Sequence, residues 1–300
     1  MSISDAYWEL VVDDVRDALA LLRPTFNDSD GLDGFVSIEV APDLAFNTEG
    51  TIAAARSLHA RINQPNLFVK IPATSQGIAA IHRLTSEGRN VNVTLIFSLR
   101  RYGEVIDAYI SGLEQFASAG GDMSTVHSVA SFFVSRVDAE VDQRLTAIGS
   151  TNALALRGRA AVAQASIAYQ LFSTRFSSQQ WNELAAANAR PQRPLWASTS
   201  TKNPAYPDTL YVDALIGPGT INTLPEAMVA HFEDHGTVAR TIDLDVESAA
   251  EVLNDLQAIG IDMDDVGRIL EEAGVRRFQE SFTHVLSTLA SKATGEASRT

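Results

Sequence analysis

Asn66-Leu-Phe-Val-Lys-Ile-Pro-Ala-Thr74 is a short apolar segment that contains one charged residue, Lys70. Its aromatic and branched residues predict a buried strand over 66–71. A lysine at the carboxyl end of such a strand would be partly desolvated. Loss of water disfavours an ammonium ion, and a neutral amine can attack a carbonyl carbon. A lysine that reaches solvent or pairs with a buried carboxylate fits the same strand equally well.

Similar apolar segments alternate with longer amphipathic stretches along the chain. They predict five more strands, near 34–40, 91–97, 126–134, 193–197 and 210–216. Helical spacing predicts helices over 51–61, 77–87, 102–119 and 157–173, and then over 225–235, 246–258, 263–273 and 275–292. Strands that are apolar throughout and joined by helices indicate a parallel sheet covered on both faces.

The fold class predicted from this alternation is α/β, and the commonest such architecture at this length is the TIM (β/α)₈ barrel. A closed barrel needs eight strands, whereas the sequence predicts six. No linker rich in proline, glycine or serine separates a second domain. We therefore expect residues 1–300 to form one incomplete barrel domain, with the helices of 225–292 packed on it.

Composition excludes several classes of partner. The formal net charge of -14 disfavours binding to nucleic acid or to an anionic membrane surface. The chain has no cysteine, which excludes disulfides and thiolate metal ligands. No apolar stretch reaches the roughly 18 residues that span a bilayer, and the acidic N-terminus lacks the basic flank of a secretory signal. These features favour a cytoplasmic enzyme.

Polar side chains also stand near the ends of other predicted strands. They are Glu39, Asn92, Thr94, Ser131 and Arg136. Each alone is weak evidence, because an arginine can pair with a nearby carboxylate and a small hydroxyl can fill a barrel layer. Together with the lysine they supply an acid, an amine, an amide, two hydroxyls and a guanidinium at the ends of successive strands. That combination is what an active site of a barrel enzyme needs.

Four segments, in this order, resemble the transaldolase family. They are Phe68-Val-Lys-Ile-Pro-Ala-Thr-Ser-Gln-Gly-Ile78, Asn92-Val-Thr-Leu-Ile-Phe-Ser98, Ala130-Ser-Phe-Phe-Val-Ser-Arg-Val-Asp138 and Trp196-Ala-Ser-Thr-Ser-Thr-Lys-Asn-Pro204, and the resemblance runs from about residue 35 to about residue 289. It implies a (β/α)₈ barrel that moves a dihydroxyacetone unit from sedoheptulose 7-phosphate to glyceraldehyde 3-phosphate, giving erythrose 4-phosphate and fructose 6-phosphate. It also implies that neither a cofactor nor a metal takes part.

The resemblance assigns a role to each candidate residue. Lys70 would form the imine with the ketose, while Glu39 and Thr94 would position the water that carries protons. Asn92 and Ser131 would hold sugar hydroxyls. The phosphate would be bound by Arg136 and Ser198, with Lys202 as a further cation, although an ordinary loop lysine is the alternative for Lys202.

The sequence departs from the family at its beginning. The family carries an aspartate for C–C cleavage on its first strand and a Thr-Ser-Asn-Pro type of motif on its second, and this sequence contains neither. Residues 7–22 resemble the helix that follows the second strand. We therefore expect the two strands to precede Met1, which leaves open edges at 34–40 and 210–216. Open strand edges promote self-association, so a homo-oligomer is possible.

Alternative functions remain open at this point. Another class I aldolase for sugar phosphates would use the same lysine with different flanking motifs. A catalytically impaired fragment that binds sugar phosphates would account for the absent aspartate. His231 and His235 have the spacing of a helical zinc site, but the order is not His-Glu-x-x-His, so we expect no metal there.

Overall fold

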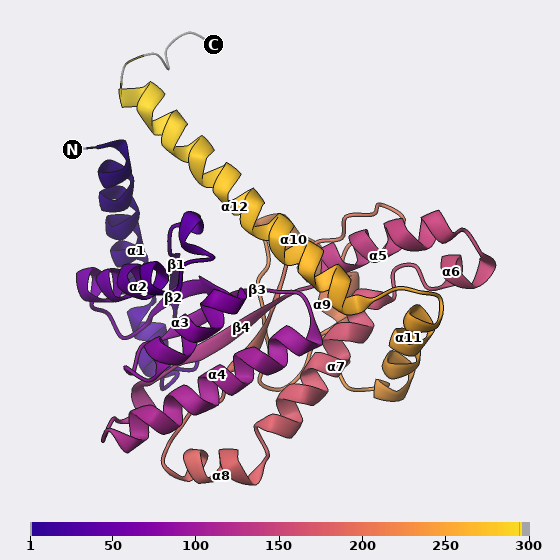
Figure 1. The fold of residues 1–300 in the computed structure, drawn as a ribbon, viewed down its shortest axis with the longest axis horizontal. Coiled ribbons are helices and arrows are strands. Elements are labelled where there is room, and N and C mark those ends of the chain that lie inside the picture. The colour runs from indigo at the N-terminus through magenta and orange to yellow at the C-terminus, as the bar shows by residue number, and fades with distance from the viewer. Residues whose placement is uncertain (1, 294, 296–300) are drawn as a thin grey trace.

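The computed structural model describes residues 2–293 and 295 of the chain. Its centre is a sheet of six parallel strands that lie in chain order (Figure 1). The strands are β1 (Val36–Glu39), β2 (Leu67–Pro72), β3 (Val91–Ile96), β4 (Ser128–Phe133), β5 (Arg193–Ala197) and β6 (Ile221–Asn222). Within the described residues, β1 and β6 each pair with one strand only. The predicted fold class, an incomplete barrel of TIM type, is confirmed.

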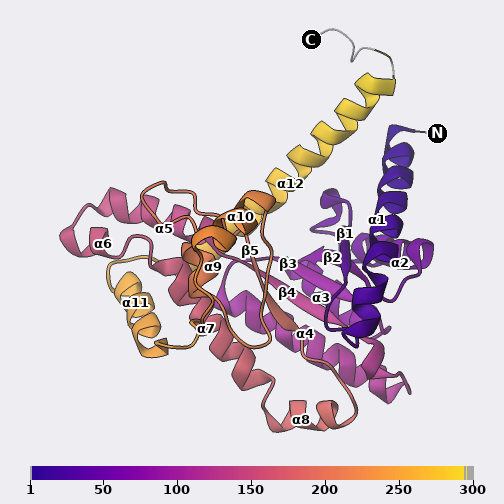
Figure 2. The same cartoon turned by 180° about the vertical axis from the view of Figure 1, so that it is seen from behind.

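The helices pack around the sheet: the first precedes β1, most of the others lie between strands in the chain, and the last crosses the molecule (Figures 1 and 2). They are α1 (Ile3–Asp28), α2 (Thr48–Ile62), α3 (Ser75–Thr85), α4 (Leu99–Ser118), α5 (Ser135–Ile148), α6 (Thr151–Ala155), α7 (Ala160–Arg175), α8 (Gln179–Ala186), α9 (Leu210–Ala214), α10 (Glu226–His235), α11 (Val246–Ala258) and α12 (Met263–Ala293). Short 3₁₀ turns lie at Pro42–Leu44 and Met123–Thr125. Among the described helices, none combines the length and apolar character that crossing a membrane requires.

Capping residues turn the chain sharply from strand to helix at the carboxyl edge of the sheet. Thr74, which follows β2, accepts a hydrogen bond from the backbone N–H of Gly77, and Ser98, which follows β3, accepts one from that of Arg101. Each hydroxyl satisfies a donor that the first turn of a helix leaves free. The short connections therefore hold the last residues of β2 and β3 in fixed positions, close to one another.

The prediction of the sixth strand is wrong. Residues 210–216 do not form a strand: Leu210–Ala214 is the short helix α9. The strand next to β5, on the side away from β4, is β6, which has only two residues. Tyr211 and Val212 of α9 are buried, and the hydroxyl of Tyr211 donates to Asp138. A short apolar run that is buried on several sides has the same composition in a helix as in a strand.

The two predicted helices over 263–273 and 275–292 are one continuous helix, α12, of 31 residues. Gly274, which suggests an interruption, lies inside it. A Cβ atom at this position would stand 2.9 Å from Cδ2 of Leu95 in β3, so the glycine permits close packing of α12 on the sheet. Figure 1 shows α12 crossing the molecule and extending beyond its body.

The buried residue His127 should make the stability of the fold sensitive to acid. Burial, reinforced by the charge of Arg190, lowers the pKa of His127 to about 4 from the usual 6.5. Between pH 6.5 and pH 4 the unfolded chain binds a proton on this histidine more readily than the folded protein does. The contribution of neutral His127 to the free energy of unfolding is therefore complete above pH 6.5 and is lost as the pH falls through 4. We expect His127→Gln to reduce the loss of unfolding free energy between pH 6.5 and 4 by about 2–3 kcal/mol. Urea unfolding across this range measures it, with exposed His284→Gln as the control.

Candidate active site

Lys70 and Glu39 meet at the carboxyl edge of the sheet. The two residues are register partners in neighbouring parallel strands, so their side chains leave the same face. Lys70 Nζ lies 3.7 Å from Glu39 Oε2, and 27% of the lysine side chain and 33% of the glutamate side chain are exposed. The lysine is therefore partly buried, and it pairs with a carboxylate as the alternative interpretation of this strand expects. The distance is that of an ion pair and is too long for a strong hydrogen bond.

Burial dominates the electrostatics of Glu39. Desolvation raises the pKa of this carboxyl group, and the positive charge of Lys70 offsets only part of the rise. The glutamate thus takes up a proton more readily than an exposed carboxylate does. An amine and an acid of raised pKa in contact form a pair that can exchange protons with a bound reactant.

Asn92 and Ser131 form a hydrogen-bonded chain beside this pair. Asn92 is the register partner of Lys70 on β3. The hydroxyl of Ser131 donates to Asn92 Oδ1 at 2.7 Å, and Asn92 Nδ2 donates to the Ser37 hydroxyl at 3.0 Å. The two bonds fix the orientation of the amide. Ser37 and Asn92 also line a cavity of about 590 Å³ that opens on the inner face of the sheet.

Thr94 lies two residues beyond Asn92 on β3 and therefore on the same face. Its side chain is fully buried, and its hydroxyl has no hydrogen-bond partner among the described residues. Buried hydroxyl groups in native proteins are nearly always hydrogen-bonded. The Thr94 hydroxyl is therefore a buried polar group that the described residues leave unsatisfied.

Arg136 is the second residue of α5 and lies directly after β4. Its guanidinium is 5.3 Å from the centre of the Phe133 ring. Burial, followed by the charge of Arg277 on α12, lowers the pKa of Arg136. None of the ion pairs found within residues 2–293 includes Arg136: Asp138 accepts hydrogen bonds from Ala161 and a tyrosine instead. The alternative that this arginine serves a local carboxylate is therefore not observed.

Ser198 contacts Ser135, the residue that precedes Arg136 at the start of α5. Its hydroxyl is 3.0 Å from that of Ser135, and its carbonyl accepts a hydrogen bond from the Ser135 backbone N–H. Its φ of 56° is in the left-handed region, which marks a sharp turn after β5. Lys202 is exposed in the loop that follows. No hydrogen bond or ion pair of the described residues joins Lys202 to this group.

Three residues at the site were not predicted from the sequence. Ser37 could have been found, because it lies two residues before Glu39 and thus on the same face of β1. Ser135 precedes Arg136 and marks the start of a helix, but nothing local indicates its contact with β5. Arg277 is about 140 residues from Arg136 in the chain, and only the folded structure shows that its charge acts on the site.

The histidines of α10 do not form a metal site with other ligands in the part of the chain that the structure describes. His231 Nδ1 lies 3.0 Å from one oxygen of Asp208, and His235 Nε2 lies 2.9 Å from the other. Hydrogen bonding to this carboxylate raises the pKa of His235. The pair therefore ties α10 to the loop after β5.

Comparison with known proteins gives a consistent result. A family model described as transaldolase/fructose-6-phosphate aldolase matches residues 1–289. A protein of Parafrankia sp. (strain EAN1pec) named transaldolase is 53% identical over 96% of this chain and 79% of its own length. Transaldolases of Thermobifida fusca and Mycobacterium bovis are 49% and 51% identical, over 97% and 92% of this chain and 79% and 75% of their own lengths. The chain belongs to the transaldolase/fructose-6-phosphate aldolase family.

Proposed function

We propose that this chain is a transaldolase that transfers a dihydroxyacetone unit from sedoheptulose 7-phosphate to glyceraldehyde 3-phosphate. The observation that carries the proposal is the contact between Lys70 and Glu39 on neighbouring strands, in a chain about 50% identical to proteins named transaldolase. We place the reaction in the cytoplasm and in the non-oxidative pentose phosphate pathway. Residues 1–300 would act as one domain.

The proposed reaction begins with attack of the neutral Lys70 amine on the ketose carbonyl, and loss of water gives an imine. The protonated imine accepts the electron pair of the C3–C4 bond as it breaks, the proton of the C4 hydroxyl passes through bound water to the Glu39 carboxylate, and the aldose leaves with its new aldehyde group. The remaining enamine attacks the carbonyl carbon of the acceptor aldehyde. Water then hydrolyses the imine and restores the lysine.

Glu39 and Thr94 would position the water that moves protons during imine formation and hydrolysis. The raised pKa of Glu39 supports this role, since a carboxyl group that binds and releases protons nearer neutrality is a better general acid and base. The free hydroxyl of Thr94 supports it as well, because a water molecule would satisfy that buried group.

Asn92 and Ser131 would hold the hydroxyl groups of the substrate. Their mutual hydrogen bond keeps both side chains in place before substrate arrives, which lowers the cost of ordering them on binding. Such contacts would also retain the enamine until the acceptor enters. We assign the phosphate to Arg136 and Ser198, whose positions are coupled through Ser135, and propose Lys202 as a weaker contributor from the following loop.

A two-substrate assay tests the proposed activity. The protein is incubated with fructose 6-phosphate and erythrose 4-phosphate, and the products are separated by chromatography. A transaldolase forms sedoheptulose 7-phosphate and glyceraldehyde 3-phosphate. Release of free dihydroxyacetone from fructose 6-phosphate at the same rate without the acceptor would instead support a class I aldolase. Lack of both reactions, with substrate bound, would support a fragment that only binds sugar phosphates.

Removal of the arginine assigned to the phosphate should raise KM selectively for phosphorylated substrates. Arg136→Ala is expected to raise KM for fructose 6-phosphate by about tenfold to a hundredfold, because a charge-assisted contact remote from the reacting carbons is lost. Dihydroxyacetone, which carries no phosphate, should be much less affected. Steady-state kinetics with both compounds measures the difference, and an equal proportional loss for both would show that Arg136 is structural.

A further inference from the structure

We propose that Arg277 of α12 is a second anion-binding residue that acts with Arg136 on the phosphate of the sugar substrate. The inference rests on the proposed function for the identity of the ligand, a phosphate monoester of a sugar. It assigns to α12 a part in binding that neither the strand-end motifs nor the loop lysine indicates.

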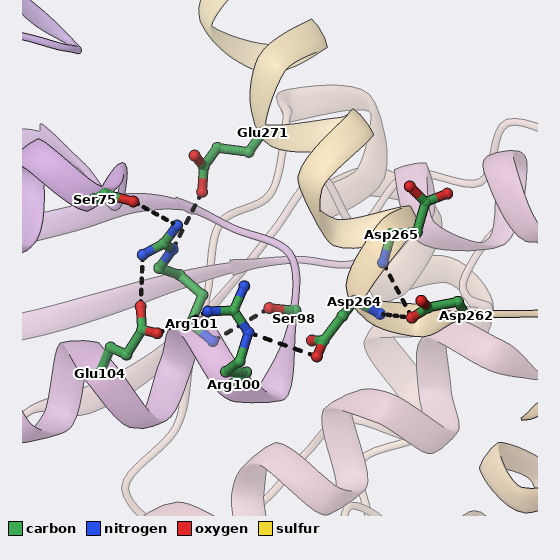
Figure 3. Close-up of polar contacts among 9 residues, drawn as sticks. All are labelled: Ser75, Ser98, Arg100, Arg101, Glu104, Asp262, Asp264, Asp265 and Glu271. Atoms are coloured by element: carbon green, nitrogen blue, oxygen red, sulfur yellow. Dashed lines mark hydrogen bonds and ion pairs between the residues drawn. The ribbon is translucent and has the colours of Figure 1, made fainter.

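The position of α12 over the sheet is fixed by ion pairs with α4 (Figure 3). Arg101 Nε lies 3.2 Å from Glu271 Oε2, and Arg100 Nε lies 3.5 Å from Asp264 Oδ2. The Arg101 and Glu271 side chains are only 13% and 16% exposed, so this pair is less screened by solvent than a surface pair. The same arginine also donates to the Ser75 hydroxyl at the start of α3.

Two glycines bring α12 close to the carboxyl end of β3. A Cβ atom on Gly267 would lie 2.8 Å from Cβ of Ser98, and one on Gly274 would lie 2.9 Å from Cδ2 of Leu95. Side chains at these positions would push the helix away from the strand end. The helix segment that follows Gly274 is therefore held at the edge where the candidate active site lies.

Arg277 lies on the face of α12 that is directed to the site. Residues three and four positions apart share one side of a helix, so Arg277 is aligned with Gly274 and Ser281. Gly274 packs against β3, whereas Ser281 lines a cavity of about 200 Å³ together with Glu39. The helix also packs against α5, on which Arg136 is the second residue. Arg277 thus stands between the end of β3 and the glutamate of the site.

The two guanidinium groups are not neutralised by the protein. No ion pair found among residues 2–293 includes Arg136 or Arg277, although the full sequence has 37 acidic and 23 basic residues. Arg277 acts as a like charge on Arg136 and lowers the pKa of that group further than burial alone. Repulsion between the half-buried Arg136 guanidinium and this second, exposed cation is relieved when a dianion binds between them.

A phosphate group fits these two arginines. Guanidinium groups present several N–H donors in a planar arrangement that matches phosphate oxygens. Arg136 lies just after β4 at the start of α5, and Arg277 lies on the helix that packs against α5, so the two would contact different oxygens of one phosphate. The exposed position of Arg277 suits a residue that meets a charged substrate as it arrives from solvent.

The test compares Arg277→Ala with a matched control, Arg276→Ala. Arg276 is also exposed on α12 and also lacks an ion pair among the described residues, but it points about 100° away around the helix. The same charge is removed from the same helix in both variants. Borohydride trapping of the imine is titrated with fructose 6-phosphate and with dihydroxyacetone, the latter as the phosphate-free reference.

Arg277→Ala should raise the ratio of the half-saturating concentrations, fructose 6-phosphate over dihydroxyacetone, by about tenfold, which is the effect of losing one good ionic contact. Arg277→Lys should recover part of this loss, and Arg276→Ala should change the ratio by less than about twofold. Equal ratios for the two alanine variants, or an equal rise for both compounds, would overturn the proposal.

A direct binding measurement separates this inference from the proposed function. If the unmodified protein forms no imine with either compound, the proposed activity fails, and the anion site is then tested by calorimetric titration with inorganic phosphate. Weaker phosphate binding by Arg277→Ala than by Arg276→Ala would support the two-arginine site on its own. Identical phosphate affinities in these two variants would refute it.

Discussion

Lys70→Ala should abolish imine formation and reduce transaldolase turnover by roughly 10⁴-fold or more, because it removes the amine that forms the covalent intermediate. The effect should appear in kcat and in trapping, with little change in the far-ultraviolet circular dichroism spectrum. Borohydride reduction in the presence of fructose 6-phosphate measures it, with incorporation of the sugar carbon into protein as the readout.

The chain offers matched controls, since only three of its residues are lysines: Lys70, Lys202 and Lys292. Lys292→Ala removes an exposed amine from the end of α12 and should leave trapping unchanged. Equal loss of trapping in Lys70→Ala and Lys292→Ala would rule out the assignment of the nucleophile. A Lys70→Arg variant keeps the positive charge beside Glu39 but forms no imine, and it should therefore be as inactive as the alanine variant.

Glu39→Gln should lower kcat by about 10²- to 10⁴-fold, the usual contribution of a general acid or base. Glutamine has the shape of glutamate but cannot exchange a proton at neutral pH. Imine formation should become slow, so that trapping is incomplete at short times and approaches the level of the unmodified protein at long times. A variant that turned over at the normal rate would exclude a proton-transfer role for Glu39.

The pH dependence of kcat/KM should also report the role of Glu39. Burial raises the pKa of Glu39 above its usual 4.5 in the free protein. If its carboxylate acts as a base, kcat/KM falls as pH decreases through this raised value, so the acidic limb lies above pH 4.5. In Glu39→Gln that limb should disappear. Profiles of the two proteins between pH 4 and 8 compare it directly, and an unchanged limb in the variant would assign it to another group.

Much of the fold could be predicted because a single rule applies to most of it. Buried parallel strands are apolar along their whole length, and this predicted β2, β3 and β4 with errors of one or two residues at their ends. The same rule reveals Lys70 and Glu39 as exceptions within apolar strands. Alternation of side chains then explains why residues two positions apart, such as Asn92 and Thr94 of β3, lie on one face.

The errors occurred where burial does not depend on local periodicity. The segment 210–216 is as apolar as a strand, but it forms helix α9 because Tyr211 is buried against α5, where its hydroxyl donates to Asp138. The true sixth strand, β6, has two residues, which is too short to create a pattern. Gly274 resembles a helix end, yet its lack of a side chain serves the contact with Leu95.

The candidate site likewise combines residues that local sequence predicts with residues that only distant packing brings in. Its strand residues follow from local sequence, whereas contributions from α12 depend on how a distant helix packs. The charge of Arg277 acts on Arg136 across two helices, and the ion pair between Glu271 and Arg101 helps to hold α12 in place (Figure 3). Nothing in the seven or eight residues around Arg277 indicates a ligand. The Asn92–Ser131 hydrogen bond likewise required the register of β3 and β4.

Mass spectrometry of the trapped protein identifies the lysine that forms the Schiff base. The protein is reduced with borohydride in the presence of fructose 6-phosphate and digested with trypsin. Modification of Lys70 blocks cleavage after it, so we expect a single modified peptide that spans residues 62–83. An adduct on Lys202 or Lys292 instead, or an active protein that carries no adduct at all, would contradict the claim that Lys70 is the Schiff-base lysine.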